Sequence, residues 1–243
     1  MRIAVVSDIH GNLPALLAVV ADFTRRGIDQ VVNLGDSLSG PLLPRETAQY
    51  LMAQPHWIHL AGNHERQILS LYEKSSSVDI YAHAQLTSVE LAWIATLPFV
   101  RSLNEEVLLC HGTPTSDVTS LLENAAQAAT PAEIEIRLGA VSASLILCGH
   151  THVPRSVRSQ GKLIVNPGSV GHPAFRDNYP YPHAIQSGSP DARYAIVEKH
   201  GDDWVSSLFS VPYQHQAMAA LARTNQRPDW EHILLTGYVP SPP

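Results

Sequence analysis

Cysteine is nearly absent from this 243-residue sequence, which contains only Cys110 and Cys148. Two cysteines cannot form the disulfide framework that holds a small secreted protein together. Each of them ends a short apolar run with the character of a β-strand, so buried structural thiols are favoured over a redox pair. This usage predicts a protein of a reducing compartment.

Long apolar runs and clustered positive charge are also missing. No run approaches the roughly 18 apolar residues of a membrane span, and the run at residues 3–6 is too short for a secretory signal before Asp8 interrupts it. The formal net charge is -6, which argues against a broad nucleic-acid-binding surface because phosphate contacts need clustered Lys and Arg. We therefore expect a cytoplasmic protein without a membrane partner, and the sequence predicts no oligomeric state.

The sequence does contain an alternation of strand and helix patterns. Runs rich in Val, Ile and Leu at residues 2–7, 30–34 and 57–60 alternate with helical apolar spacing at residues 13–26 and 44–53. This βαβαβ order predicts a parallel sheet with right-handed crossovers, in which the loops after the strands meet at one edge. Ligands of such sheets bind at that edge.

The remainder of the chain fits one α/β domain over residues 1–243. Residues 65–96 have helical spacing throughout, and residues 172–190, rich in Tyr, Pro, His, Ser and Gly, predict an extended surface loop. The other expected elements are a hairpin at 99–103 and 107–110, a helix at 131–138, strands at 144–148 and 163–165, a second hairpin at 192–197 and 204–211, and a C-terminal tail with helices near 216–223 and 230–235.

Side chains of metal-binding character follow five of the expected strands. They are Asp8, His10, Asp36, Asn63, His64, His111, His150 and His152. Each alone is ordinary, since an Asp at such a place can cap the next helix and a single His is usually solvated. Five such strand ends in one α/β chain favour a shared site.

Carboxylate, amide and imidazole groups together suit manganese, iron or zinc. Even without His64, the seven other candidate ligands exceed what one ion needs, so we expect two ions, with Asp36 central enough to bridge them. Two ions about 3.5–4 Å apart can activate a water and stabilise the attacking and leaving oxygens of an in-line displacement. The expected reaction is hydrolysis of a phosphate ester.

The motifs are Asp-x-His at 8–10, Gly-Asp at 35–36, Gly-Asn-His-Glu at 62–65, His111 and Gly-His-x-His at 149–152. In this order they resemble the calcineurin-like metallophosphoesterase superfamily, above all its small bacterial and archaeal phosphodiesterase branch. The resemblance spans residues 2–171, and Asn-Pro-Gly-Ser at 166–169 is similar as well. It implies an α/β fold in which a two-sheet β-sandwich of mixed strands is flanked by helices.

The same resemblance implies roles for single residues. One ion would be held by Asp8, His10, Asp36 and His152, and the other by Asp36, Asn63, His111 and His150. His64 matches the histidine of the family that binds no metal, and would be the catalytic residue that protonates the leaving group or stabilises charge at the scissile phosphate.

The sequence departs from this branch after Gly171, where relatives pass through a short Arg-containing turn but residues 172–190 are extended. We expect Arg176 to bind the substrate phosphate and His172 to bind substrate or shape the pocket, the alternative being a surface loop without such roles. Glu65 could orient His64, although a Glu in the first turn of a helix is equally explained by the helix dipole.

Two classes of function remain. The first is a binuclear metal-dependent phosphoesterase that acts on a small molecule or nucleotide, with a diester favoured over a monoester as substrate. It would use two divalent ions, with manganese preferred over iron or zinc. The second is a non-catalytic scaffold or binding module on the same fold, although such a protein would be expected to have lost His64 or a ligand. A nucleic-acid-processing role is disfavoured by the charge.

Overall fold

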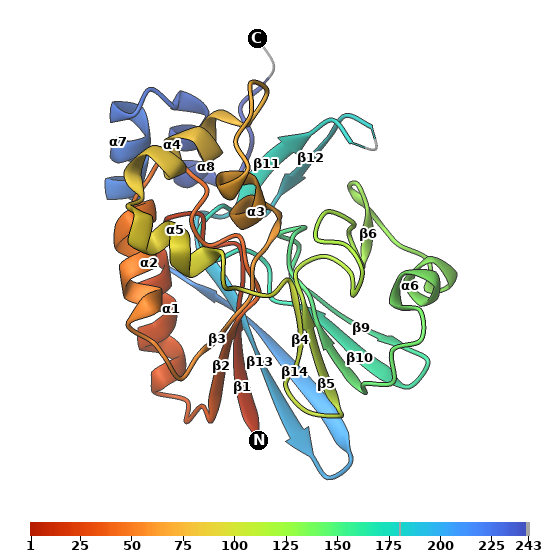
Figure 1. Cartoon of the computed structure of the whole chain (residues 1–243). Coiled ribbons are helices and arrows are strands. Elements are labelled where there is room, and N and C mark those ends of the chain that lie inside the picture. Colours follow the sequence, from red (N-terminus) through yellow and green to blue (C-terminus); the bar gives the residue numbers. More distant parts are fainter. Residues whose placement is uncertain (180, 242–243) are drawn as a thin grey trace.

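Two five-stranded sheets packed face to face form the centre of the computed structural model, which describes residues 1–179 and 181–241 (Figure 1). The first sheet has the order β14-β13-β1-β2-β3. Strands β1 to β3 run parallel, and β13 pairs antiparallel with both β1 and β14. The strands are β1 Arg2–Val6, β2 Gln30–Asn33, β3 Ile58–His59, β13 Ala192–His200 and β14 Asp203–Val211.

The second sheet has the order β4-β5-β8-β10-β9. Its three inner strands are parallel, while β4 and β9 close the edges in antiparallel pairs. The strands are β4 Val100–Ser102, β5 Val107–Cys110, β8 Leu145–Leu147, β9 Arg155–Ser159 and β10 Lys162–Asn166. The α/β class and the two-sheet sandwich of mixed strands are therefore confirmed.

Strict alternation along the strands decides which side chains fill the space between the sheets. In β1, Ile3 and Val5 point into the inter-sheet core, where they meet apolar side chains of the second sheet such as Leu109. Their neighbours Ala4 and Val6 belong to the cluster packed under helix α1, because successive strand residues face opposite sides. Both faces of β1 are thus buried, which fixes its register and the position of the residues that follow it.

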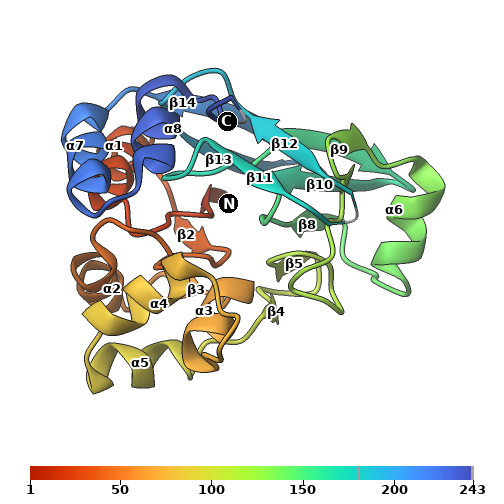
Figure 2. The same ribbon diagram turned by 90° about the horizontal axis from the view of Figure 1, so that it is seen from above.

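Helices cover the outer faces of both sheets and one end of the sandwich (Figures 1 and 2). Helices α1, α2 and α5 lie beside the first sheet and α6 beside the second, whereas α3, α4, α7 and α8 gather at the end where β1 and β2 terminate. The helices are α1 Leu13–Thr24, α2 Pro44–Met52, α3 Asn63–Leu69, α4 Ser77–Gln85, α5 Ser88–Ile94, α6 Pro131–Leu138, α7 His215–Thr224 and α8 Pro228–Thr236.

One sequence-based expectation about local structure is wrong, and a second is confirmed with interruptions. The segment 172–190, expected to be a loop, contains a two-stranded sheet of β11 Ala174–Asp177 and β12 His183–Gln186, held by the pairing of Phe175 with Ile185; Pro180 within it lies outside the described residues. The helical pattern at 65–96 is divided among α3, α4 and α5. A further short hairpin, β6 Glu123–Asn124 and β7 Gln127–Ala128, precedes α6.

Both cysteines are buried and unpaired, as expected. They lie on the outer face of the second sheet, in the cluster covered by Ile134 and Leu138 of α6. Burial raises the pKa of the Cys110 thiol to about 12, so the protonated thiol is the stable form. In the residues that the structure describes, no helix has the length and apolar character required to cross a membrane.

Candidate metal and catalytic site

The ends of five strands bring the candidate ligands together at one end of the sandwich. Asp8 follows β1, Asp36 follows β2, Asn63 opens α3 after β3, His111 follows β5, and His150 and His152 follow β8. Five of the candidates have left-handed backbone conformations, with φ between 51° and 71°: Asp8, His10, Asp36, His150 and His152. Non-glycine residues adopt this region at a cost of about 1–3 kcal/mol each and concentrate at functional sites.

Two glycines allow the turns to approach the carboxylates closely. A Cβ at Gly62 would overlap the side chain of Asp36, and one at Gly149 would overlap the hydroxyl of Ser7 and crowd Asp8. The glycine in each of these two motifs is therefore required by packing against the site.

Backbone carbonyls fix how three of the imidazoles are turned. The Nδ1 atom of His10 lies 2.7 Å from the carbonyl oxygen of Ser39, and Nδ1 of His111 lies 2.9 Å from that of Leu34. Nδ1 of His152 lies 2.7 Å from the carbonyl of His172. Because a carbonyl only accepts, each Nδ1 carries a proton and donates it, which leaves Nε2 as the ring nitrogen that faces the site.

Several buried polar atoms at the site lie close together without bonding to one another. His111 Nε2 is 3.0 Å from Asp36 Oδ2, and His152 Nε2 is 3.3 Å from Asp8 Oδ1. Nevertheless His111 Nε2, Asp8 Oδ1 and Asn63 Oδ1 lack a properly directed hydrogen bond among the described residues. Buried atoms of this kind are normally satisfied, and unsatisfied ligand-type atoms gathered at one end of the sandwich fit divalent metal binding.

Two groups of ligand atoms, each within 4.8 Å of one another, share one carboxylate. Asp36, His111 and His150 form one group, and Asp8, His10 and Asp36 form the other. The mixture of carboxylate oxygen and imidazole nitrogen is the donor set of a manganese, iron or zinc site. The residues present therefore fit divalent metal binding.

The electrostatics of the site agree with this donor set. Burial, reinforced by neighbouring imidazoles, lowers the pKa of His10 to about 3 and that of His150 to about 4, so both rings are neutral near pH 7. Burial alone would lower the pKa of His111, but the carboxylates of Asp36 and Asp8 raise it to about 10. The pocket thus attracts positive charge, and a metal ion would compete with that proton.

His64 lies beside the ligands but is held by different contacts. Its backbone N–H donates to Asp36 Oδ1 at 2.9 Å, and its Nδ1 lies 2.8 Å from Oδ1 of Asp79, a buried residue of α4. Burial would lower the pKa of His64, but Asp36 and Asp79 outweigh it and raise the pKa to about 9. With Nδ1 donating its proton to the Asp79 carboxylate in a hydrogen bond, the ring can hold a second proton at Nε2 beside the ligand cluster.

Glu65 positions the loop of Asp36, and the hydrogen bonds of its carboxylate among the described residues go to backbone N–H groups and not to the His64 ring. Its fully buried carboxylate accepts three backbone N–H groups, those of Asp36, Ser37 and Gly62, each at 2.8 Å. It thereby ties the turn after β2 to the start of α3. Glu65 occupies the capping-box position of α3. The sequence suggested that it orients His64 or responds to the helix dipole, but neither interpretation included its bonds to the turn of Asp36.

A cavity of about 690 Å³ opens beside these residues. Its wall includes His64, His172 and Arg176, and Arg176 also donates to the carbonyl of Pro240 at 2.8 Å. Arg227 and Trp230 from the C-terminal region also line it. Their contribution, like that of Asp79, could not be read from the sequence, because all three lie outside the strand-end motifs and no spacing relates them to the ligands.

Comparison with known proteins agrees with a phosphoesterase fold. Residues 1–185 match the family model described as the calcineurin-like phosphoesterase superfamily domain. A protein of Methanocaldococcus jannaschii whose function is uncharacterised is 25% identical over 253 residues, covering 94% of each chain.

Two solved structures share the fold over nearly their whole length. A metallophosphoesterase from Sphaerobacter thermophilus gives a TM-score of 0.76 at 24% identity, covering 96% of this chain and 98% of its own. A hypothetical protein from Pyrococcus horikoshii gives 0.75 at 17% identity, covering 97% and 98%. The match to the family model, which covers the strand ends and every candidate ligand, shows that the chain belongs to the calcineurin-like phosphoesterase superfamily.

Proposed function

We propose that the protein hydrolyses a phosphate ester of a small molecule or nucleotide, a diester in preference to a monoester, with the help of two divalent ions. The observation that carries this proposal is the convergence of buried ligand atoms that lack protein partners, next to a histidine that is paired with a carboxylate. A family fold alone would not require either feature.

The ligand set divides into two sites that share Asp36. Asp8, His10 and His152 would complete one, and Asn63, His111 and His150 would complete the other. Manganese is the first candidate, with iron or zinc as alternatives. When bound, two such ions supply Lewis acidity and lower the pKa of a water molecule so that it becomes a nucleophile near neutral pH.

His64 acts on the leaving group. The hydrogen bond from Nδ1 to the Asp79 carboxylate favours the protonated ring, so Nε2 can carry a proton and transfer it to the departing oxygen. Asp79 holds Nδ1 and thereby orients the ring toward the cavity. Asn63, one residue earlier, presents its free Oδ1 as a neutral ligand instead.

The cavity provides room for the ester. Its volume of about 690 Å³ lies within the range of small-molecule sites. Arg176 stands on the wall with a guanidinium group that can pair with an anionic oxygen of the substrate. Substrates with a group on each side of the phosphate can use both the ligand end and this wall, which supports the diester preference.

The test compares His64→Ala and Asn63→Ala with the wild type, using a chromogenic phosphodiester and monoester with added manganese. We expect His64→Ala to retain both ions and to lose about 100-fold or more in rate, whereas Asn63→Ala lowers the metal content. His200→Ala, an exposed histidine remote from the ligands, serves as the control. Bound metal without turnover of any ester would favour the non-catalytic scaffold, and full activity of His64→Ala would disprove the role of His64.

A further inference from the structure

His172 is held rigidly at the edge of the ligand cluster. It follows the glycine-rich turn after β10, and its side chain is buried, with the residue only 7% exposed. Its backbone N–H donates to Ser169 Oγ at 2.8 Å, and its carbonyl oxygen accepts the Nδ1 proton of His152. The ring stacks on Trp230 of α8, with centroids 3.9 Å apart and planes within 6°.

The Nε2 atom of His172 has no hydrogen-bond partner among the described residues. A buried polar atom left unsatisfied destabilises the folded state, so this nitrogen needs a partner that the described residues do not provide. The stack on Trp230 holds the plane of the ring at the edge of the ligand cluster.

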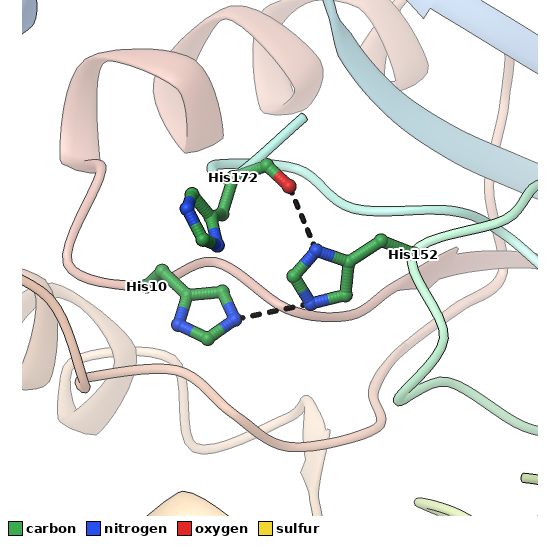
Figure 3. Close-up of side chains that lie close together, drawn as sticks. All are labelled: His10, His152 and His172. Atoms are coloured by element: carbon green, nitrogen blue, oxygen red, sulfur yellow. Dashed lines mark hydrogen bonds between the residues drawn. The ribbon is translucent and has the colours of Figure 1, made fainter. Parts of the chain in front are cut away.

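Three imidazoles converge at this point (Figure 3). One ring nitrogen each of His10, His152 and His172 lies within 4.8 Å of the other two, and the Nε2 atoms of His10 and His152 are 3.2 Å apart. Adjacent ligands of one zinc ion, bound at about 2.0–2.1 Å, are separated by roughly 3 Å. The spacing of the first two rings matches a shared ion, and the third lies within reach of it.

The lone pairs of these rings also oppose one another. His10 and His152 donate their Nδ1 protons to carbonyls, so their Nε2 lone pairs face each other. Two facing lone pairs repel unless a cation or proton lies between them. A third imidazole turned to the same place strengthens the preference for a cation.

We propose that His172 is an additional protein ligand of the ion held by Asp8, His10, Asp36 and His152, and that Trp230 is the positioning residue that fixes its ring. This inference rests on the proposed metal site. It replaces the contact with substrate expected for His172 from the sequence. The ion then has three imidazoles and two carboxylates, a donor set that favours zinc, iron, cobalt or nickel over magnesium or manganese. The preference for manganese proposed above therefore does not hold at this site and applies to the second ion alone.

The experiment measures metal binding directly on the full chain. Protein stripped with a chelator is titrated with cobalt(II), whose visible absorption reports the ligands and coordination number, and zinc and manganese affinities are measured by competition with a chromophoric chelator. His172→Phe removes the ring nitrogens but can keep the stack on Trp230. His183→Phe, the same change at a histidine of the cavity wall whose Nδ1 lies near the Tyr181 carbonyl, is the matched control.

We expect His172→Phe to lower the affinity for one of the two ions at least about tenfold, to change the cobalt spectrum and to reduce the preference for zinc over manganese. The control variant His183→Phe should bind metal as the wild type does. Trp230→Leu should alter the same spectrum to a smaller degree. His172→Gln repeats the measurement with a smaller polar side chain if the phenylalanine variant misfolds.

Unchanged affinities and spectrum in the His172 variants would overturn the proposal, and a raised KM at unchanged metal binding would assign His172 to the substrate. A wild-type protein that binds no divalent metal would instead overturn the proposed function.

Discussion

The variant Glu65→Gln offers the sharpest test of how the turn after β2 is held. Glu65 Oε2 accepts the N–H groups of Asp36 and Gly62, and Oε1 accepts that of Ser37, each at 2.8 Å. In Glu65→Gln the carbonyl oxygen can keep the first pair, but the amide NH2 then faces the N–H of Ser37, so a donor opposes a donor. One buried N–H left without an acceptor costs about 1–3 kcal/mol.

The assay is urea unfolding of the metal-free protein, followed by tryptophan fluorescence, since bound metal would itself stabilise the folded state. With a slope of about 2–3 kcal/mol per molar urea, the expected loss lowers the midpoint by roughly 0.5–1 M. Metal affinity should fall as well, because the backbone N–H of Asp36 is one of the three groups that Glu65 holds.

Glu133→Gln is the matched control. Glu133 occupies the same capping-box position in α6, where it accepts the N–H of Thr130 at 2.7 Å, but it is only partly buried and water can replace the lost contact. Its variant should unfold nearer the wild-type midpoint and bind metal as the wild type does. If Glu65→Gln has the wild-type midpoint and metal affinity, the three backbone contacts do not hold the turn as argued.

Two further predictions concern other carboxylates. Asp79→Asn should lower the rate of ester hydrolysis about 10–100-fold with unchanged metal content, because His64 loses its charged partner; steady-state kinetics with metal analysis tests this, and an unaltered rate would contradict it. Asp22 is partly desolvated, which raises its pKa, but hydrogen bonds from Arg26, Tyr194 and Arg25 lower it to about 2. The stability that ionised Asp22 contributes is therefore complete above its ordinary pKa near 4 and is lost as the pH falls toward 2. After solvent screening, Asp22→Asn should lower the free energy of unfolding by about 1 kcal/mol at pH 7 and by less below pH 4. If denaturant unfolding shows the same difference between variant and wild type at every pH in this range, the reasoning is wrong.

The ligand cluster was accessible to sequence reasoning because it depends on strand ends. Asp8, Asp36 and His111 each follow a short apolar run, and a parallel arrangement forces such positions to one edge. The two-sheet arrangement came from the family resemblance. The alternation of apolar residues did not reveal it, because strands buried on both faces look alike in one sheet or two.

The rest of the pocket depends on contacts between segments far apart in the chain. Trp230 reaches His172 across 58 positions of sequence, and Asp79 reaches His64 from a different helix. The hairpin of β11 and β12 was also missed, since the Tyr and Pro residues between its strands and the Ser and Gly residues after them are typical of loops, and only the pairing of the two strands reveals it. Such tertiary contacts override local propensity.

The antiparallel pairing of β1 with β13 has a consequence for the biogenesis of the protein. Ile3 leaves the ribosome well before its partner Val197, which lies 194 positions further along the chain. Until then β1 is an uncovered edge strand of the nascent sheet, with apolar side chains on both faces and a tendency to pair wrongly. The turn that carries Asp8 acquires its final support late, so metal loading should follow, and not guide, completion of the first sheet.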